Sequence, residues 1–303
     1  MKKKFFPFLM TLWCNATLIF FILRLIPGDP AELMLGGNAR EEEVVKLRGD
    51  LLLDRPLYEQ YALFMKNLVT ANLGDSFIQK KPVLLLVQKA FYPTCIISFI
   101  SVFMAYIIGI FLGVWAAIKK DTPIDYLLRF CSMVILTIPI FSFALLLILL
   151  FSLQLHLLPV SELSTLRHYI LPVMTLAIPL GMVLMRFVRV RFLEEETMPF
   201  VQVHRAKGSE GFHLYRKILK VILSSVNNIT ALQLSVVLTG TLVTESIFDI
   251  PGVGRLMFDA IAARDYPVVQ GVTIYMSIVY LFVFFLFDFL NGFIDPRWRS
   301  IEA

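Results

Sequence analysis

The chain has 303 residues, of which 58% are hydrophobic and only 17% carry a formal charge, and its net charge is +5. A soluble globular domain is about half apolar and about one quarter charged. This composition excludes a disordered chain, argues against a soluble enzyme and favours a polytopic membrane protein.

Six stretches of the sequence contain no charged residue and approach or exceed the length that crosses a bilayer, about 20 residues. Because hydrocarbon offers no water to unpaired backbone groups, each stretch is expected to be helical. We therefore predict an all-α polytopic membrane protein with six transmembrane helices. The stretches are 5–23, 90–118, 130–155, 169–185, 221–244 and 266–287.

The first and second stretches are separated by a long polar segment. Residues 41–69 have the pattern of short amphipathic helices interrupted at Gly49 and Pro56. Their apolar side is expected to pack on the membrane domain. It consists of Val44, Val45, Leu47, Leu51, Leu52, Tyr58, Tyr61 and Phe64. The predicted organisation is a first helix within 1–26, an outer helical loop over 27–89 and a five-helix core over 90–303.

Lysine and arginine are distributed unequally between the connecting segments, and short cytoplasmic loops are enriched in them. The two short loops 156–168 and 245–265 contain three of these residues, whereas the remaining segments outside the long loop contain sixteen. This split predicts that both termini and the loop 186–220 are cytoplasmic. The net positive charge of the chain mostly reflects this enrichment of cytoplasmic segments in lysine and arginine. No basic–aromatic patch indicates a nucleic-acid partner.

The loop 186–220 is the largest of the predicted cytoplasmic segments. Helical patterns precede and follow Gly208, and glycine tolerates the positive φ that a sharp turn requires. The sequence therefore predicts a short helix that lies along the membrane surface. The alternative interpretation is an ordinary amphipathic connector.

The sequence contains no constellation that indicates catalysis or metal binding. The three cysteines and four histidines lack metal-ligand spacing. An intramembrane enzyme would need a paired Asp, Ser–His or metal set at matching depth in two spans. A GxxxxGK[ST] phosphate loop is absent from the sequence, so the chain is not expected to bind ATP or another cofactor itself.

Several motifs in chain order resemble the membrane permease subunits of binding-protein-dependent ABC importers, in particular the dipeptide, oligopeptide and nickel permeases. The match runs along nearly the whole chain. The motifs are RLIPGDPAE (24–32), LDRPLYEQY (53–61), NLGDSF (72–77), RHYILPVMTLAIPL (167–180), HRAKG (204–208), TESIFDIPGVGRLMFDAIAARDYPVVQG (244–271) and DPR (295–297).

The resemblance implies a type I ABC importer permease fold and a set of partners. A solute-binding protein would deliver substrate at the outer face of a bacterial cytoplasmic membrane. A second homologous permease would complete the pathway, and two cytoplasmic ATPases would bind ATP and Mg²⁺. The matching loop residues would form the ATPase contact: His204, Arg205, Ala206, Lys207 and Gly208. His204 departs from the family, which usually has a small residue there.

Polar residues inside the predicted spans are candidates for the translocation pathway because hydrocarbon does not accommodate them without a role. Pro139 is expected to kink the third span. The alternative role for each hydroxyl is hydrogen bonding between helices. The candidates are Thr137, Ser142, Asn228, Gln233, Ser235 and Thr239.

Two questions about function stay open at the level of sequence. Peptide permeases and permeases for nickel or another small solute share the same architecture, and much of the selection lies in the binding protein. A self-sufficient channel or carrier is a different class, which inverted repeats would support, and no such repeats are visible in the sequence.

Overall fold

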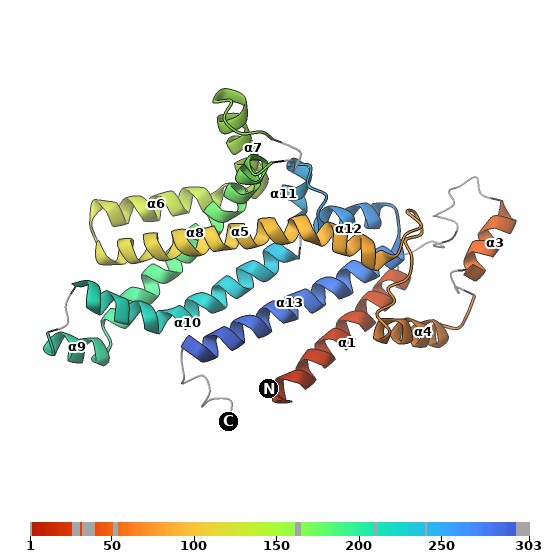
Figure 1. Cartoon of the computed structure of the whole chain (residues 1–303), viewed down its shortest axis with the longest axis horizontal. Coiled ribbons are helices and arrows are strands. Elements are labelled where there is room, and N and C mark those ends of the chain that lie inside the picture. Colours follow the sequence, from red (N-terminus) through yellow and green to blue (C-terminus); the bar gives the residue numbers. More distant parts are fainter. Residues whose placement is uncertain are drawn as a thin grey trace. The chain divides into compact units, whose positions relative to one another are not determined.

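The computed structural model describes residues 2–25, 31, 40–50, 54–160, 165–208, 211–239 and 241–294, and these ranges are almost entirely helical. The motif DPR (295–297) and most of RLIPGDPAE (24–32) lie outside the described residues. The helices (Figure 1) are α1 (Lys2–Leu25), α3 (Glu41–Asp50), α4 (Leu57–Val69), α5 (Val83–Ile118), α6 (Pro123–Thr137), α7 (Ile140–Leu147), the π-helical η1 (Ile148–Gln154), α8 (Arg167–Glu196), α9 (Pro199–Ala206), α10 (Gly211–Leu238), α11 (Leu242–Ile247), α12 (Val253–Ala262) and α13 (Tyr266–Ile294).

Five of the described helices are long and apolar enough to cross a membrane, and a bent pair of helices raises the number to six if it forms one span. The prediction of an all-helical polytopic protein is therefore confirmed. The five helices contain the segments Phe6–Leu25, Val83–Ile118, Arg167–Glu196, Gly211–Leu238 and Tyr266–Gly292.

The third predicted span is broken and not merely kinked. Its two halves, α6 and Ile140–Gln154, meet at an angle of 105°. Proline restricts the preceding residue to extended backbone and has no N–H to donate. Accordingly Ile138 has φ −78° and ψ 123°, and Pro139 precedes the first turn of α7. The helix is interrupted at Pro139, as predicted, but the angle between its two halves is much larger than a kink.

Several helices extend beyond the uncharged stretches from which they were predicted. Helix α5 begins at Val83 and not at residue 90, and α8 continues to Glu196 past residue 185. Long charged side chains can leave the hydrocarbon while their helix continues into the interface. Absence of charge therefore marks the lipid-embedded part of a helix and not its ends. Helix α10 is the exception at one end, since it stops at Leu238 before residue 244.

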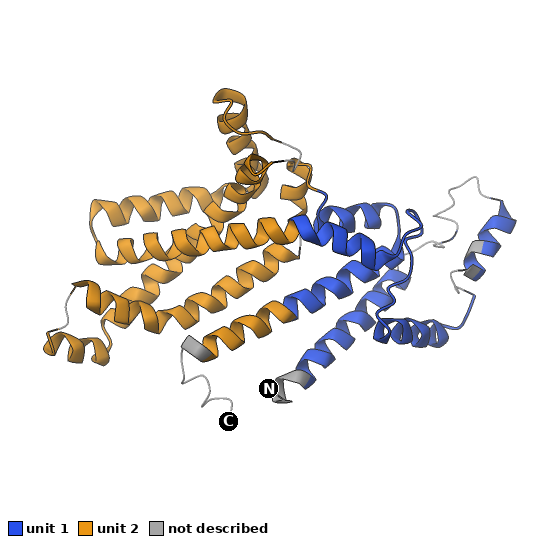
Figure 2. Cartoon of the chain, viewed as in Figure 1, with its two compact units in different colours: residues 1–93, 251–281 blue, residues 94–250, 282–303 orange. Residues whose placement is uncertain are grey.

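The chain divides into two compact units (Figure 2). Unit 1 comprises residues 1–93 and 251–281, and unit 2 comprises residues 94–250 and 282–303. Helices α5 and α13 each run from one unit into the other. The division of the chain into segments 1–26, 27–89 and 90–303 stays a prediction.

In unit 1 the helix α4 packs on α1 through aromatic side chains. Phe20 contacts the rings of Tyr61 and Phe64 at centroid distances of 5.2 and 5.3 Å. The break at Pro56 is confirmed, because α4 begins directly after it. The predicted break at Gly49 is wrong, since α3 continues through Gly49 to Asp50.

The prediction of which side of α3 and α4 packs on the rest of the protein is only partly correct. Tyr61 and Phe64 are half-buried, but Val45 and Tyr58 are 63% and 70% exposed. In helices as short as these, the pattern of apolar residues does not determine which face packs against the rest of the protein. Leu51 and Leu52 lie outside the described residues, as does the side chain of Leu47.

A second contact in unit 1 joins two of the family motifs. Asp265, in the turn between α12 and α13, is buried, and its Oδ2 atom accepts a hydrogen bond from the hydroxyl of Ser76 at 2.5 Å. The backbone N–H groups of Phe77 and Ile78 also donate to this carboxylate, at 3.1 and 3.4 Å. Hydrogen bonds to a charged acceptor are stronger than neutral ones. One carboxylate therefore fixes the loop before α5 to the turn before α13.

In unit 2 the helix α8 packs on α6, α7 and α10. Two glycines of α5 face α8 so closely that a Cβ atom added to Gly109 would lie 2.6 Å from Cβ of Leu184. A Cβ atom added to Gly113 would lie 2.7 Å from Cβ of Val188. Small residues allow two helix backbones to approach in this way. The GxxxG spacing of these two glycines therefore places α5 directly against α8.

Candidate functional site

The loop between α8 and α10 folds into a short helix that ends in a glycine turn. Helix α9 has Pro199 in its first turn, which suits the fixed φ of proline. It ends at Ala206, and Gly208 has φ +75°. The helices on both sides of Gly208 and its left-handed backbone agree with the expectation from the sequence.

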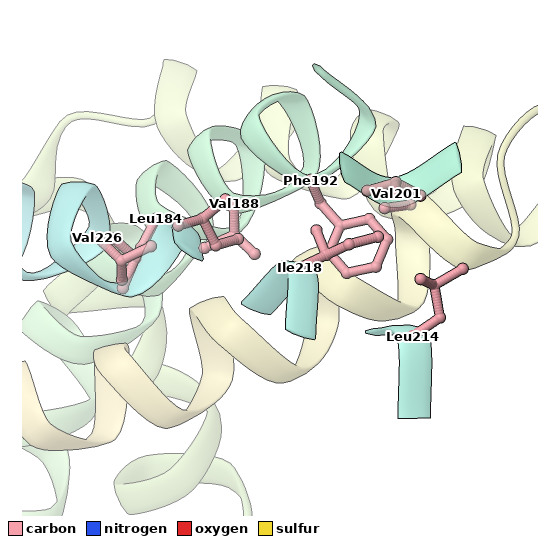
Figure 3. Close-up of a cluster of buried hydrophobic side chains, with 9 residues drawn as sticks. Leu184, Val188, Phe192, Val201, Leu214, Ile218 and Val226 are labelled. Carbon is pink, nitrogen blue, oxygen red and sulfur yellow. The ribbon is translucent and has the colours of Figure 1, made fainter. Parts of the chain in front are cut away.

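The underside of α9 is fixed to the rest of unit 2 by a buried apolar cluster. Val201 is the buried residue of α9, and its exposed fraction is zero. Side chains from α8, α9 and α10 meet there (Figure 3). The members of this cluster are Ala117, Leu184, Val188, Phe192, Val201, Leu214, Ile218, Ile222 and Val226. Because protein interiors are close-packed, this cluster attaches α9 to the adjoining end of α8.

The other face of α9 and the turn after it are open to solvent. Arg205, Ala206, Lys207 and Gly208 are all exposed, and His204 is half-buried. The Nδ1 atom of His204 lies 3.1 Å from Nζ of Lys217 on α10. A small residue between two basic ones leaves room for close approach of another surface, and offers cations to an acidic one. The five residues predicted for a docking site thus lie next to one another at the end of α9 and in the turn after it, and four of them are exposed.

Arg205 has a partner within the loop that sequence reasoning missed. Its Nη2 atom donates to Oε1 of Glu196 at 2.6 Å, and the two side chains are 51% and 30% exposed. An exposed pair of this kind stabilises by at most about 1 kcal/mol. The three consecutive glutamates at the end of α8 could have indicated a partner for Arg205. Their distance from α9, however, depends on the turn at Thr197 and Met198, which the sequence does not define.

The six candidates for the translocation pathway do not form one cluster. No two of them share a hydrogen bond in the part of the chain that the structure describes. Thr137, Ser235 and Thr239 donate to carbonyl groups of their own helical segments. Ser142 is half-buried on α7. These four positions stay predictions for the translocation pathway, as do Asn228 and Gln233.

The remaining two candidates, both on α10, bond to other helices. Buried Gln233 donates to the carbonyl oxygen of Leu180 on α8 at 3.1 Å, and its own Oε1 atom has no hydrogen-bond partner among the described residues. Asn228 accepts from Nδ2 of Asn291 on α13 at 2.7 Å. Interhelical bonding, the alternative role for these side chains, is therefore present in both cases.

Asn291 is the centre of an amide network that the sequence did not reveal. Its Oδ1 atom accepts from Asn227 at 3.1 Å, and Asn227 in turn accepts from the hydroxyl of Tyr106 on α5. Asn291 itself is fully buried. Three helices are joined by this network within unit 2. The described residues contain no group of three or more His, Cys, Asp or Glu side chains that could hold a metal ion.

Comparison with known proteins identifies the family. Residues 109–300 match the family model of the binding-protein-dependent transport system inner membrane component, and residues 1–99 match the N-terminal family of these membrane components. The chain is 32% identical to the glutathione transport system permease protein GsiC of Escherichia coli strain CFT073, over 98% of this chain and 97% of that protein. It is 33% identical to the GsiC protein of Pectobacterium atrosepticum, with the same coverage.

The fold has a solved counterpart. A chain of the inward-facing MetNI methionine ABC transporter aligns with a TM-score of 0.57 and 17% identity, and the alignment covers 70% of this chain and 97% of that chain. The family matches, the similarity along nearly the whole length and this shared fold lead to one conclusion. The chain belongs to the inner membrane components of binding-protein-dependent transport systems, and it is a multi-pass permease subunit of an ABC importer.

Proposed function

We propose that the chain forms half of a translocation pathway for small peptides, in a complex whose ATPase subunits dock on α9. A solute-binding protein delivers the peptide, and a second permease subunit forms the other half. Two separate ATPase subunits bind ATP and Mg²⁺ and hydrolyse the ATP. The chain itself binds no cofactor. We refer to α9 as the coupling helix from here on.

The observation that supports docking is the two-sided character of the coupling helix. Its underside is fixed by buried Val201, whereas Arg205, Ala206 and Lys207 are exposed on the turn at its end. A surface that receives a force from a partner must be exposed on one side and rigidly attached on the other. An ordinary connector needs no such attachment.

The similarity to GsiC proteins supports a peptide as the substrate. Those relatives are named for glutathione transport, and glutathione is itself a tripeptide. Their similarity extends over 97% of their length, so it includes the spans as well as the loops. Glutathione and simple dipeptides are therefore the first solutes to test. Uptake of Ni²⁺ and no peptide by the complete transporter would contradict this substrate class.

Charge reversal at Arg205 tests the docking surface. Arg205→Glu should weaken co-purification of the ATPase, because the exposed cation is replaced by an anion. The same change also destroys the pair with Glu196. The double variant Glu196→Arg/Arg205→Glu restores that internal pair but leaves the charge at position 205 reversed.

The double variant separates the two roles of Arg205. We expect it to co-purify with the ATPase as poorly as the single variant, since the pair with Glu196 contributes at most about 1 kcal/mol. Amounts of each variant in the membrane, measured by immunoblot, serve as the control. Full recovery of ATPase binding in the double variant would show that Arg205 only stabilises the loop.

We further propose that both termini and the coupling helix lie in the cytoplasm, whereas α4 lies outside. The support is the excess of lysine and arginine in the corresponding segments, sixteen against three. In a variant whose native cysteines are replaced by alanine, a single cysteine at exposed Tyr58 should react with an impermeant thiol reagent in intact cells. A cysteine at exposed His213 should react only after permeabilisation. The reverse pattern would refute this orientation.

A further inference from the structure

A buried carboxylate joins two helices and a turn of unit 2. Asp125 lies in the first turn of α6, and its exposed fraction is zero. Its two oxygens accept from Nε and Nη2 of Arg189 on α8, each at 2.7 Å. The backbone N–H of Asp121, in the turn between α5 and α6, donates to the same carboxylate at 3.1 Å. Arg129, one turn further along α6, lies 3.4 Å away.

The geometry of this ion pair makes it a rigid connection. Two parallel N–H···O bonds fix the separation of the groups and also the plane that they share. The Arg189 side chain is only 13% exposed, so solvent screens the pair weakly. By contrast, the pair between Arg191 and Glu194 is exposed and joins two residues of the same helix. That pair cannot transmit movement between helices.

The position of Arg189 relates this connection to the coupling helix. Val188 and Phe192 of α8 belong to the apolar cluster that contains Val201 of α9. Arg189 lies between them in sequence but binds α6. The end of α8 is therefore attached to α9 by apolar packing and to α6 by the ion pair. A displacement of α9 reaches α6 through these two attachments in series.

We propose that Asp125 and Arg189 are a positioning pair that makes α6, the first half of the broken span, follow α8 when the coupling helix moves. The proposal rests on the proposed role of α9 as the ATPase contact, and it adds the route by which movement passes from there to the broken span. Without the pair, the coupling helix still binds the ATPase, but α6 no longer follows it.

Removing both charges together tests this role without leaving one charge buried and uncompensated. The test variant is Asp125→Asn/Arg189→Gln. The matched control is Arg191→Gln/Glu194→Gln, which removes the exposed pair of the same helix. Arg189→Lys is a second test variant, since it keeps the charge but cannot form two parallel bonds.

The readout is a distance between spin labels in the complete transporter, reconstituted in lipid nanodiscs. The labels are placed on exposed Leu127 of α6 and exposed Met198, the residue before α9. Distances are measured without nucleotide and with ATP bound to a hydrolysis-deficient ATPase. Replacing the native cysteines by alanine leaves these as the only labelled positions. The replaced residues are Cys14, Cys95 and Cys131.

The unmodified pair and the control variant should give one narrow distance distribution that ATP does not change. Both test variants should give a broader distribution without nucleotide and a shifted one with ATP, while equal amounts of ATPase co-purify. Test variants with the narrow, unchanged distribution would overturn the proposal, and so would a shift in the unmodified protein. Should the double variant not accumulate, Arg189→Lys decides the result.

Failure of the proposed docking function would appear in a different measurement. In that case the Arg205 variants would retain the ATPase. The nucleotide-free distance distributions would still show whether the ion pair fixes α6 to α8, because they do not depend on the ATPase.

Discussion

Replacing Gly208 with valine should leave the amount of protein in the membrane unchanged and abolish most ATPase binding. Gly208 has φ +75°, and a Cβ atom added there would meet no atom of the described residues within 4 Å. The expected effect is therefore confined to the backbone. A non-glycine residue in this conformation costs about 1–3 kcal/mol. If that cost falls on the docking geometry, affinity for the ATPase decreases about 5- to 150-fold.

The matched control for this variant is Gly208→Asn. Asparagine tolerates the left-handed region far better than a β-branched residue, and the described residues leave space around the position. We expect Gly208→Asn to bind the ATPase almost as well as the unmodified chain in the same co-purification assay. Equal ATPase binding by the valine variant, at equal expression, would show that the turn is an ordinary connector.

Replacing Gly113 with alanine should destabilise the whole permease. The added methyl would lie 2.7 Å from Cβ of Val188 and 2.8 Å from the backbone oxygen of Met185. A backbone atom cannot move aside like the end of a side chain, so α5 and α8 must separate. Overpacking of this kind costs about 1–3 kcal/mol. The change should lower the midpoint of thermal unfolding in detergent and the yield of folded protein.

Gly292→Ala is the control, because it adds the same methyl to helix α13 where no atom of the described residues lies within 4 Å. Alanine favours helix over glycine by up to about 1 kcal/mol, so this variant should unfold at the same temperature or slightly higher. A Gly113→Ala variant as stable as Gly292→Ala would contradict the close approach of α5 and α8.

The helical membrane fold could be predicted from sequence because its cause is local. A long uncharged run must be helical in lipid wherever its neighbours lie, and Pro139 was expected to bend its helix because proline lacks a backbone N–H and clashes with the preceding turn. The turn at Gly208 was also predictable, since glycine between two helical patterns indicates positive φ. The 105° angle at Pro139 could not be predicted, because it depends on what each half of the broken span packs against.

The polar contacts inside the fold could not be predicted because their partners are far apart in sequence. Asp125 and Arg189 read as ordinary loop charges until α6 and α8 are placed together. Asn228 stays a predicted pathway residue, but its hydrogen bond to Asn291 on α13 could not be predicted. The pairing of Arg205 with Glu196 likewise depends on a turn between two helices. The sequence shows that such residues are polar and that burying them costs free energy, but it does not show which of them form contacts with one another.

Reconstitution of the chain in proteoliposomes tests the central claim, that this permease transports only with its partners. The sequence contains no GxxxxGK[ST] loop, and the coupling helix ends in an exposed turn that we propose as the ATPase contact. The chain alone should neither hydrolyse ATP nor take up labelled glutathione. Addition of the second permease, the ATPase and the binding protein should produce ATP-dependent glutathione uptake. ATP-driven uptake by the purified chain alone would contradict the claim.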